Sequence, residues 1–117
     1  MRHFTAKEFT CDGVNVFTEM DPDFLNLLDK AREIAGVPFR LSSTYRTLAH
    51  NAKVGGSIKS AHLKGMAADI LVSGSEARFA IVRGLILAGI RRIGIGKHFI
   101  HCDIDPSKPQ GLIWIYD

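Results

Sequence analysis

The stretch Ser60–Asp69 limits what this chain can fold into more than any other segment. It places an imidazole, His62, and a carboxylate, Asp69, seven residues apart. Nearly every residue from Met66 to Val72 is apolar except Asp69, and such a run predicts a central, buried strand. A carboxylate is costly to bury without a partner. Asp69 therefore requires a cation or several hydrogen-bond donors.

A second polar pair, His101 and Asp103, lies in another apolar segment, and residues 99–104 are predicted to form a strand. Catalytic zinc sites use three nitrogen or oxygen ligands from the protein and leave a position for water. His62, Asp69 and His101 would supply such a set. We interpret the pattern as a metal site assembled from two distant segments.

Each of these residues also has an ordinary structural interpretation. Asp69 could form a buried ion pair, for example with Arg46. His62 taken alone is typical of a surface loop, and His101 taken alone is typical of a satisfied core histidine. Only their combination with the small residues around them favours a metal site.

The composition fits one compact domain, 1–117, with a sizeable core, since 46% of the 117 residues are apolar. The net charge of +3 comes from scattered Lys and Arg, so we expect no nucleic-acid partner. Two cysteines, Cys11 and Cys102, are too few for a disulfide framework, and we expect both to be reduced. We also expect no membrane insertion and no signal peptide, because no apolar run is long enough and the first five residues lack an apolar core.

Local signals indicate an α+β fold with a mostly antiparallel sheet and helices packed on one side. Asp21-Pro22 predicts a helix start and Gly36 its end, with an apolar stripe between them. A Ser73/Glu76 capping box predicts a later helix with Phe79, Val82 and Ile86 on one face. The predicted helices cover residues 6–9, 22–35, 48–53 and 74–88; the predicted strands cover 37–43, 66–72, 91–96, 99–104 and 112–116; residues 10–20 are predicted to be a loop.

The patterns Ser-x-His-x-x-Gly-x-Ala-x-Asp at 60–69 and Phe-Ile-His-x-Asp at 99–103 together resemble the M15 peptidases. These are zinc D-Ala-D-Ala carboxypeptidases, dipeptidases and cell-wall endopeptidases, and the Hedgehog signalling domain is their structural relative. The match is closest to a short, single-domain subgroup common in phages and prophages. Residues 20–25, 38–47 and 50–56 look like that subgroup too.

The resemblance implies a role for each matching residue. His62, Asp69 and His101 fall on the three zinc ligands. Arg46 falls on an arginine that contacts substrate and steadies the developing oxyanion, a task suited to a guanidinium. Ser60 matches a residue that holds the ligand loop or contacts substrate.

The general base is the role that the resemblance leaves open. Family members of the dipeptidase and endopeptidase type carry Glu or Asp three residues before the last zinc histidine, and this chain has His98 there. A neutral imidazole is able to take a proton near neutral pH. The alternative is Asp103, which should share a strand face with His101 and could orient that ligand.

The resemblance thus implies zinc-dependent hydrolysis of an amide bond in peptidoglycan stem peptides. Carboxypeptidase and endopeptidase action both remain open. A different class, a catalytically inactive zinc-binding module that recognises cell wall or serves as a phage structural part, is the alternative. We expect a phage- or prophage-encoded, endolysin-like monomer, made in the cytoplasm and delivered to the wall by another route.

Overall fold

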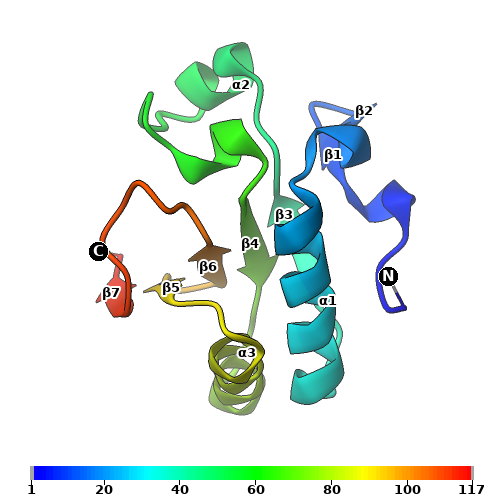
Figure 1. Ribbon diagram of the computed structural model, residues 1–117, viewed down its shortest axis with the longest axis vertical. Helices are drawn as coiled ribbons and strands as arrows, with labels where there is room; N and C mark the ends of the chain where they lie inside the picture. Colours follow the sequence, from blue (N-terminus) through cyan, green and yellow to red (C-terminus); the bar gives the residue numbers. More distant parts are fainter. Residues whose placement is uncertain (1, 117) are drawn as a thin grey trace.

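A computed structural model describes residues 2–116. Its main feature is a five-stranded sheet with the strand order β3-β4-β6-β5-β7 (Figure 1). Every neighbouring pair is antiparallel except β5 and β7, which run parallel. The predicted α+β class with a mostly antiparallel sheet is confirmed, and the single parallel pair makes the sheet mixed. The strands are β3 (Arg40–Ser43), β4 (Ala67–Leu71), β5 (Arg92–Ile95), β6 (Phe99–Asp103) and β7 (Leu112–Ile115).

Two long helices, α1 (Pro22–Ala35) and α3 (Ser75–Ala88), share one hydrophobic core with the sheet. The bounds of α1 agree with the prediction, because the Asp21 carboxylate accepts a hydrogen bond from the Phe24 N–H and Gly36 ends the helix with a positive φ of 70°. The strand residues that alternate with Asp69 and His101 point into this core. They include Ala68, Ile70, Ile100 and Cys102, all fully buried.

The packing of α1 against α3 depends on Gly84. A Cβ atom there would lie 2.5 Å from the Ala31 carbonyl oxygen and 2.9 Å from the Ala35 Cβ. Such close approach of two helix backbones is open only to a residue without a side chain. A glycine inside a helix lowers the helix propensity, but at Gly84 it allows α3 to contact the backbone of α1.

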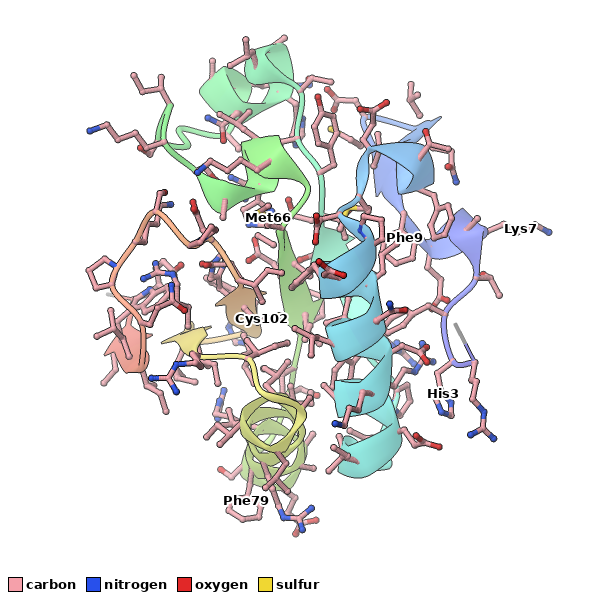
Figure 2. The ribbon with its side chains drawn as sticks, in the orientation of Figure 1. His3, Lys7, Phe9, Met66, Phe79 and Cys102 are labelled. Atoms are coloured by element: carbon pink, nitrogen blue, oxygen red, sulfur yellow. The ribbon has the colours of Figure 1, made fainter. Side chains whose placement is uncertain are left out.

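The face that α3 buries differs from the predicted one. Phe79 and Ile86 are 70% and 51% exposed, and Figure 2 shows Phe79 pointing outward from α3. Ile81, Leu85 and Ala88 are buried instead. Both sets have helical spacing on a helix that is apolar nearly all round, so periodicity alone does not choose between them. The predicted capping box is also wrong: Gly74 is the N-cap and makes no side-chain cap bond.

The segment before α1 contains more structure than predicted. Residues 10–20, expected to be a loop, include a small hairpin of β1 (Thr10–Cys11) and β2 (Val14–Asn15) and a 3-10 helix, η2 (Phe17–Glu19). Strands of two residues are too short to give a recognisable alternation. The capping box of η1 (Ala6–Glu8) is present as predicted.

Two further short helices connect the strands near the site. α2 (Leu48–Lys53) has its predicted bounds, and the Thr47 side chain accepts a hydrogen bond from the His50 N–H. η3 (Ala61–Lys64) was not predicted. Within residues 2–116 no helix is both long and apolar enough to cross a bilayer. That the whole chain forms one domain stays a prediction.

Candidate metal centre

One row of residues crosses the sheet at right angles to its strands and carries the site. Ser43 on β3 pairs with Asp69 on β4, which pairs with His101 on β6, followed by Gly94 on β5 and Trp114 on β7. Their neighbours along β4 and β6 point into the core. Because side chains alternate along a strand, this row lies on the sheet face away from the helices.

His62 reaches this row from η3 rather than from a strand. The Ser60 hydroxyl accepts a hydrogen bond from the His62 N–H at 3.2 Å, which caps η3 at its start. Gly65 ends η3 with a positive φ of 69°. A Cβ at Gly65 would lie 2.2 Å from the Glu19 carbonyl oxygen, so the backbone at this position packs directly against the end of η2. The small residues between His62 and Asp69 thus bring the imidazole back over the strand that follows it.

Three side chains converge at this point: His62, Asp69 and His101 each offer a ligand atom, and these atoms all lie within 4.8 Å of one another. The Asp69 Oδ1 atom is 3.4 Å from His62 Nε2 and 2.9 Å from His101 Nδ1. The structure thus brings three residues from two distant segments of the sequence close together.

The hydrogen bonds behind the imidazoles match the requirements of metal ligands. His62 Nδ1 donates to the Thr44 carbonyl oxygen at 2.6 Å, which leaves Nε2 pointing toward Asp69. His101 Nε2 donates to Asp103 Oδ2 at 2.7 Å, which leaves Nδ1 toward Asp69. Metal-binding histidines characteristically use one nitrogen for the ion and the other for an oxygen acceptor. The donor set of two imidazole nitrogens and one carboxylate oxygen fits zinc.

Arg46 is part of the same cluster. Its Nη2 lies 3.3 Å from Asp69 Oδ2, so the ion pair considered as an alternative for Asp69 exists beside the metal-type cluster. The guanidinium also donates through Nε to the Ser43 hydroxyl at 3.0 Å and through Nη1 to the Asn51 side-chain oxygen at 3.2 Å. Buried Asn51 in turn donates to the Ser57 carbonyl oxygen at 2.8 Å. These contacts hold Arg46 in one orientation.

The charges in the cluster shift its pKa values. Burial raises the pKa of Asp69, but hydrogen bonds from His101 and His62 outweigh burial and hold that pKa well below its usual range. Burial lowers the pKa of His101, whereas hydrogen bonds to Asp103 and Asp69 raise it, with a net increase. The carboxylate of Asp69 is therefore ionised, which is the form that binds a cation.

Asp103 is buried and has both oxygens engaged. Oδ2 accepts from His101, while Oδ1 accepts from Arg92 Nε at 2.7 Å and from the Asp105 N–H at 3.1 Å. Burial raises the pKa of Asp103, but the bond from His101 and the charge of Arg92 contribute to a net lowering. Of the two roles considered for Asp103, these contacts fit orientation of His101 better than proton transfer.

The cluster opens into a pocket of about 350 Å³. Ser60 and Arg46 lie on its wall, as the resemblance implied. Eight other lining residues were not predicted, although the alternation of Leu112, Trp114 and Tyr116 was a signal for two of them. These unpredicted residues are Gly56, Ser57, Ala61, Arg92, Phe99, Lys108, Trp114 and Tyr116.

The structure does not bring His98 to this pocket. His98 is exposed in the turn between β5 and β6 and lines a different pocket, with Val72 and Ala77 among its neighbours. His98 lies one residue before β6 begins, and its carbonyl oxygen accepts a hydrogen bond from the Val72 N–H, so the strand pairing continues there. Because side chains alternate along an extended strand, a side chain three residues from His101 points to the opposite face of the sheet. The sequence-based candidacy of His98 as general base is therefore corrected: the geometry offers it no contact with the site.

The fold and this cluster define the class: a candidate metal centre on an α+β scaffold. A family model described as "Peptidase M15" matches residues 2–103. The chain belongs to the peptidase M15 family. No curated protein matches it. The matched part contains His62, Asp69, His101 and Arg46, but ends before β7.

Proposed function

We propose that this protein is a zinc-dependent peptidase that hydrolyses an amide bond in peptidoglycan stem peptides. The observation that carries the proposal is the convergence of His62, Asp69 and His101 in one pocket with Arg46. Family membership supports metallopeptidase chemistry. The substrate class rests on the resemblance of residues 60–69 and 99–103 to the cell-wall enzymes of this family.

His62 Nε2, an Asp69 carboxylate oxygen and His101 Nδ1 would hold the zinc ion. When bound, zinc supplies Lewis acidity, which activates water at neutral pH and polarises the scissile carbonyl. Thr44 and Asp103 keep the two imidazoles oriented, because each accepts a hydrogen bond from the nitrogen that faces away from Asp69. Orienting contacts of this kind increase metal affinity.

Arg46 would bind the carbonyl oxygen of the substrate as negative charge develops on it. Its three hydrogen bonds, to Ser43, Asn51 and Asp69, fix the plane of the guanidinium before substrate arrives. The group carries more N–H donors than these bonds use. A donor that is already oriented needs no reorganisation during the reaction, which is the main source of such stabilisation.

The proposal is tested by incubating purified protein with purified peptidoglycan and measuring new amino groups and released D-Ala. We expect release of one or the other, loss of activity with a chelator, and recovery with zinc. Free D-Ala would indicate a carboxypeptidase, and new amino groups without D-Ala an endopeptidase. If zinc-loaded protein released neither product, the proposed enzymatic activity would be contradicted.

One observation favours a second candidate, the catalytically inactive zinc-binding module that recognises cell wall. Among the described pocket residues the carboxylates are Asp69, a ligand, and Asp103, whose oxygens are both engaged. Neither is placed to take a proton from water without giving up those contacts. Stoichiometric zinc and binding to insoluble peptidoglycan, with neither product above, would establish this second function.

A further inference from the structure

The pocket has an aromatic wall that the metal ligands and Arg46 leave without a role. Trp114 comes from β7, Tyr116 directly follows β7, and Phe99 comes from the start of β6. The ring centres of Phe99 and Tyr116 are 5.1 Å apart, and those of Tyr116 and Trp114 are 6.2 Å apart. Trp114 also lies 5.6 Å from the His101 ring. We call these three rings the aromatic wall.

Two glycines make room for the aromatic wall. A Cβ at Gly94 would lie 2.6 Å from Trp114 Nε1 and 2.5 Å from a Tyr116 ring carbon. A Cβ at Gly96 would lie 2.2 Å from the Phe99 ring. Both glycines belong to the β5 region between the ligand strand and β7. The rings therefore pack against bare backbone, which fits a built surface rather than loosely placed side chains.

The wall continues the ligand row. Trp114 pairs with Gly94, and Gly94 pairs with His101, so the indole is two strands from the ligand and in register with it. Arg46 and Ser57 line the same pocket from other elements. A substrate that presents an amide to the ligands has Arg46 available on one side and the aromatic wall on the other.

The chemistry of the wall combines apolar faces with hydrogen-bond donors. Burial raises the pKa of Tyr116, which keeps its hydroxyl protonated, and Trp114 offers an indole N–H. The Lys108 side chain lies in the same pocket, and Arg92 is 4.9 Å from the centre of the Trp114 ring. No carboxylate except Asp69 and Asp103 lines the described pocket.

We propose that the aromatic wall is a subsite for a saccharide ring, so that the enzyme binds its peptide together with the attached peptidoglycan sugar. A pyranose presents a face of C–H groups to an aromatic ring and hydroxyls to donors at its rim. Tyr and Trp suit such surfaces because each has an apolar body and a polar tip. The proposal rests on the proposed function, which supplies the sugar-linked peptide.

Trp114 is the only tryptophan in the chain, so its fluorescence reports directly on this subsite. The test titrates zinc-loaded protein with three probes: the disaccharide of N-acetylglucosamine and N-acetylmuramic acid, the free stem peptide, and the disaccharide-linked peptide. We expect the disaccharide alone to change Trp114 fluorescence saturably. We also expect the linked peptide to bind at least tenfold more tightly than the free peptide. The disaccharide contains no amide of the type cleaved, so its binding is measurable whether or not the protein hydrolyses peptides.

Variants assign the effect to the wall. Tyr116→Ala should weaken disaccharide binding at least tenfold, and Tyr116→Phe should retain most of it, because phenylalanine keeps the ring face that stacks on the sugar. Ile115→Ala is the matched control, because Ile115, the last residue of β7, precedes Tyr116 but is 79% exposed and is not part of the pocket. No response to the disaccharide, or equal binding of free and linked peptide, would overturn the proposal even if hydrolysis were established.

Discussion

At the scale of single residues, the site depends on contacts behind the ligands as much as on the ligands themselves. His62 is fixed by the Thr44 carbonyl and His101 by Asp103. Asp103 is in turn fixed by Arg92, which also donates to the Pro109 carbonyl oxygen at 2.6 Å. This chain of contacts connects the loop after β6 to a ligand. Its effect on zinc affinity is measurable.

Asp103→Asn should lower zinc affinity by roughly 10- to 100-fold, the usual range for loss of an orienting partner of a metal-bound histidine. The amide still accepts one hydrogen bond but loses the charge that holds the His101 proton on Nε2. Competition with a chromogenic chelator measures the affinity. Unchanged affinity would show that His101 is oriented without Asp103.

Arg46→Lys should reduce kcat/KM by about 10²–10³-fold with zinc still bound, the range typical for loss of one oriented donor to an oxyanion. Lysine keeps the charge but cannot contact Ser43, Asn51 and Asp69 in the same plane. Steady-state kinetics and zinc content of the same preparation check this. A parallel loss of zinc would assign Arg46 to the metal site instead.

The convergence of His62, Asp69 and His101 was predictable from the sequence, and the surroundings of His98 and Asp103 were not. His62, Asp69 and His101 each belong to a short sequence pattern, and their side chains meet in the structure. The position of His98 depends on where β6 begins, and a shift of a few residues at a strand end moves a side chain out of the site. Arg92 gave no signal in the sequence, because its partner Asp103 is known only once β5 and β6 are paired.

At the scale of elements, the clearest lesson comes from α3. The sequence predicted that Phe79 and Ile86 lie on the buried face. The helix instead buries Ile81, Leu85 and Ala88. The deciding residue is Gly84, since it sets which side of α3 approaches the Ala31 carbonyl. Its partner on another helix cannot be read from one sequence. By contrast α1 was predictable throughout, because its cap, stripe and terminal glycine agree.

Leu85→Ala should lower the free energy of unfolding by about 2–5 kcal/mol, because Leu85 is fully buried and its removal leaves a cavity. Phe79→Ala, on the exposed face of the same helix, is the control and should change it by no more than about 0.5 kcal/mol. Urea unfolding followed by circular dichroism gives both values. A larger loss of unfolding free energy in Phe79→Ala than in Leu85→Ala would instead support burial of the face that the sequence predicted.

At the scale of the whole molecule, buried carboxylates tie segments far apart in sequence to the core. Asp29 on α1 accepts hydrogen bonds from the N–H groups of Arg2 at 3.0 Å and His3 at 2.8 Å. Lys64 at the end of η3 pairs with buried Asp105 at 2.9 Å. Both contacts need an ionised carboxylate, so acid should weaken the attachment of these segments.

Burial raises the pKa of Asp29, but the bonds from the Arg2 and His3 N–H groups contribute to a net lowering below the ordinary value of 3.8. A lowered folded-state pKa means that Asp29 adds stability above the unfolded pKa and loses it as pH falls below that value. The difference in unfolding free energy between wild type and Asp29→Asn should therefore be larger at pH 7 than at pH 3. A difference independent of pH would contradict this assignment.

The proposed chemistry requires a zinc ion held by His62, Asp69 and His101. The most direct measurement is zinc per chain, by elemental analysis after dialysis, for wild type, His62→Ala and His98→Ala. We predict one zinc per chain in wild type and in His98→Ala and none retained in His62→Ala, with all three proteins folded. Zinc retained by His62→Ala, or lost by His98→Ala, would contradict the site described here.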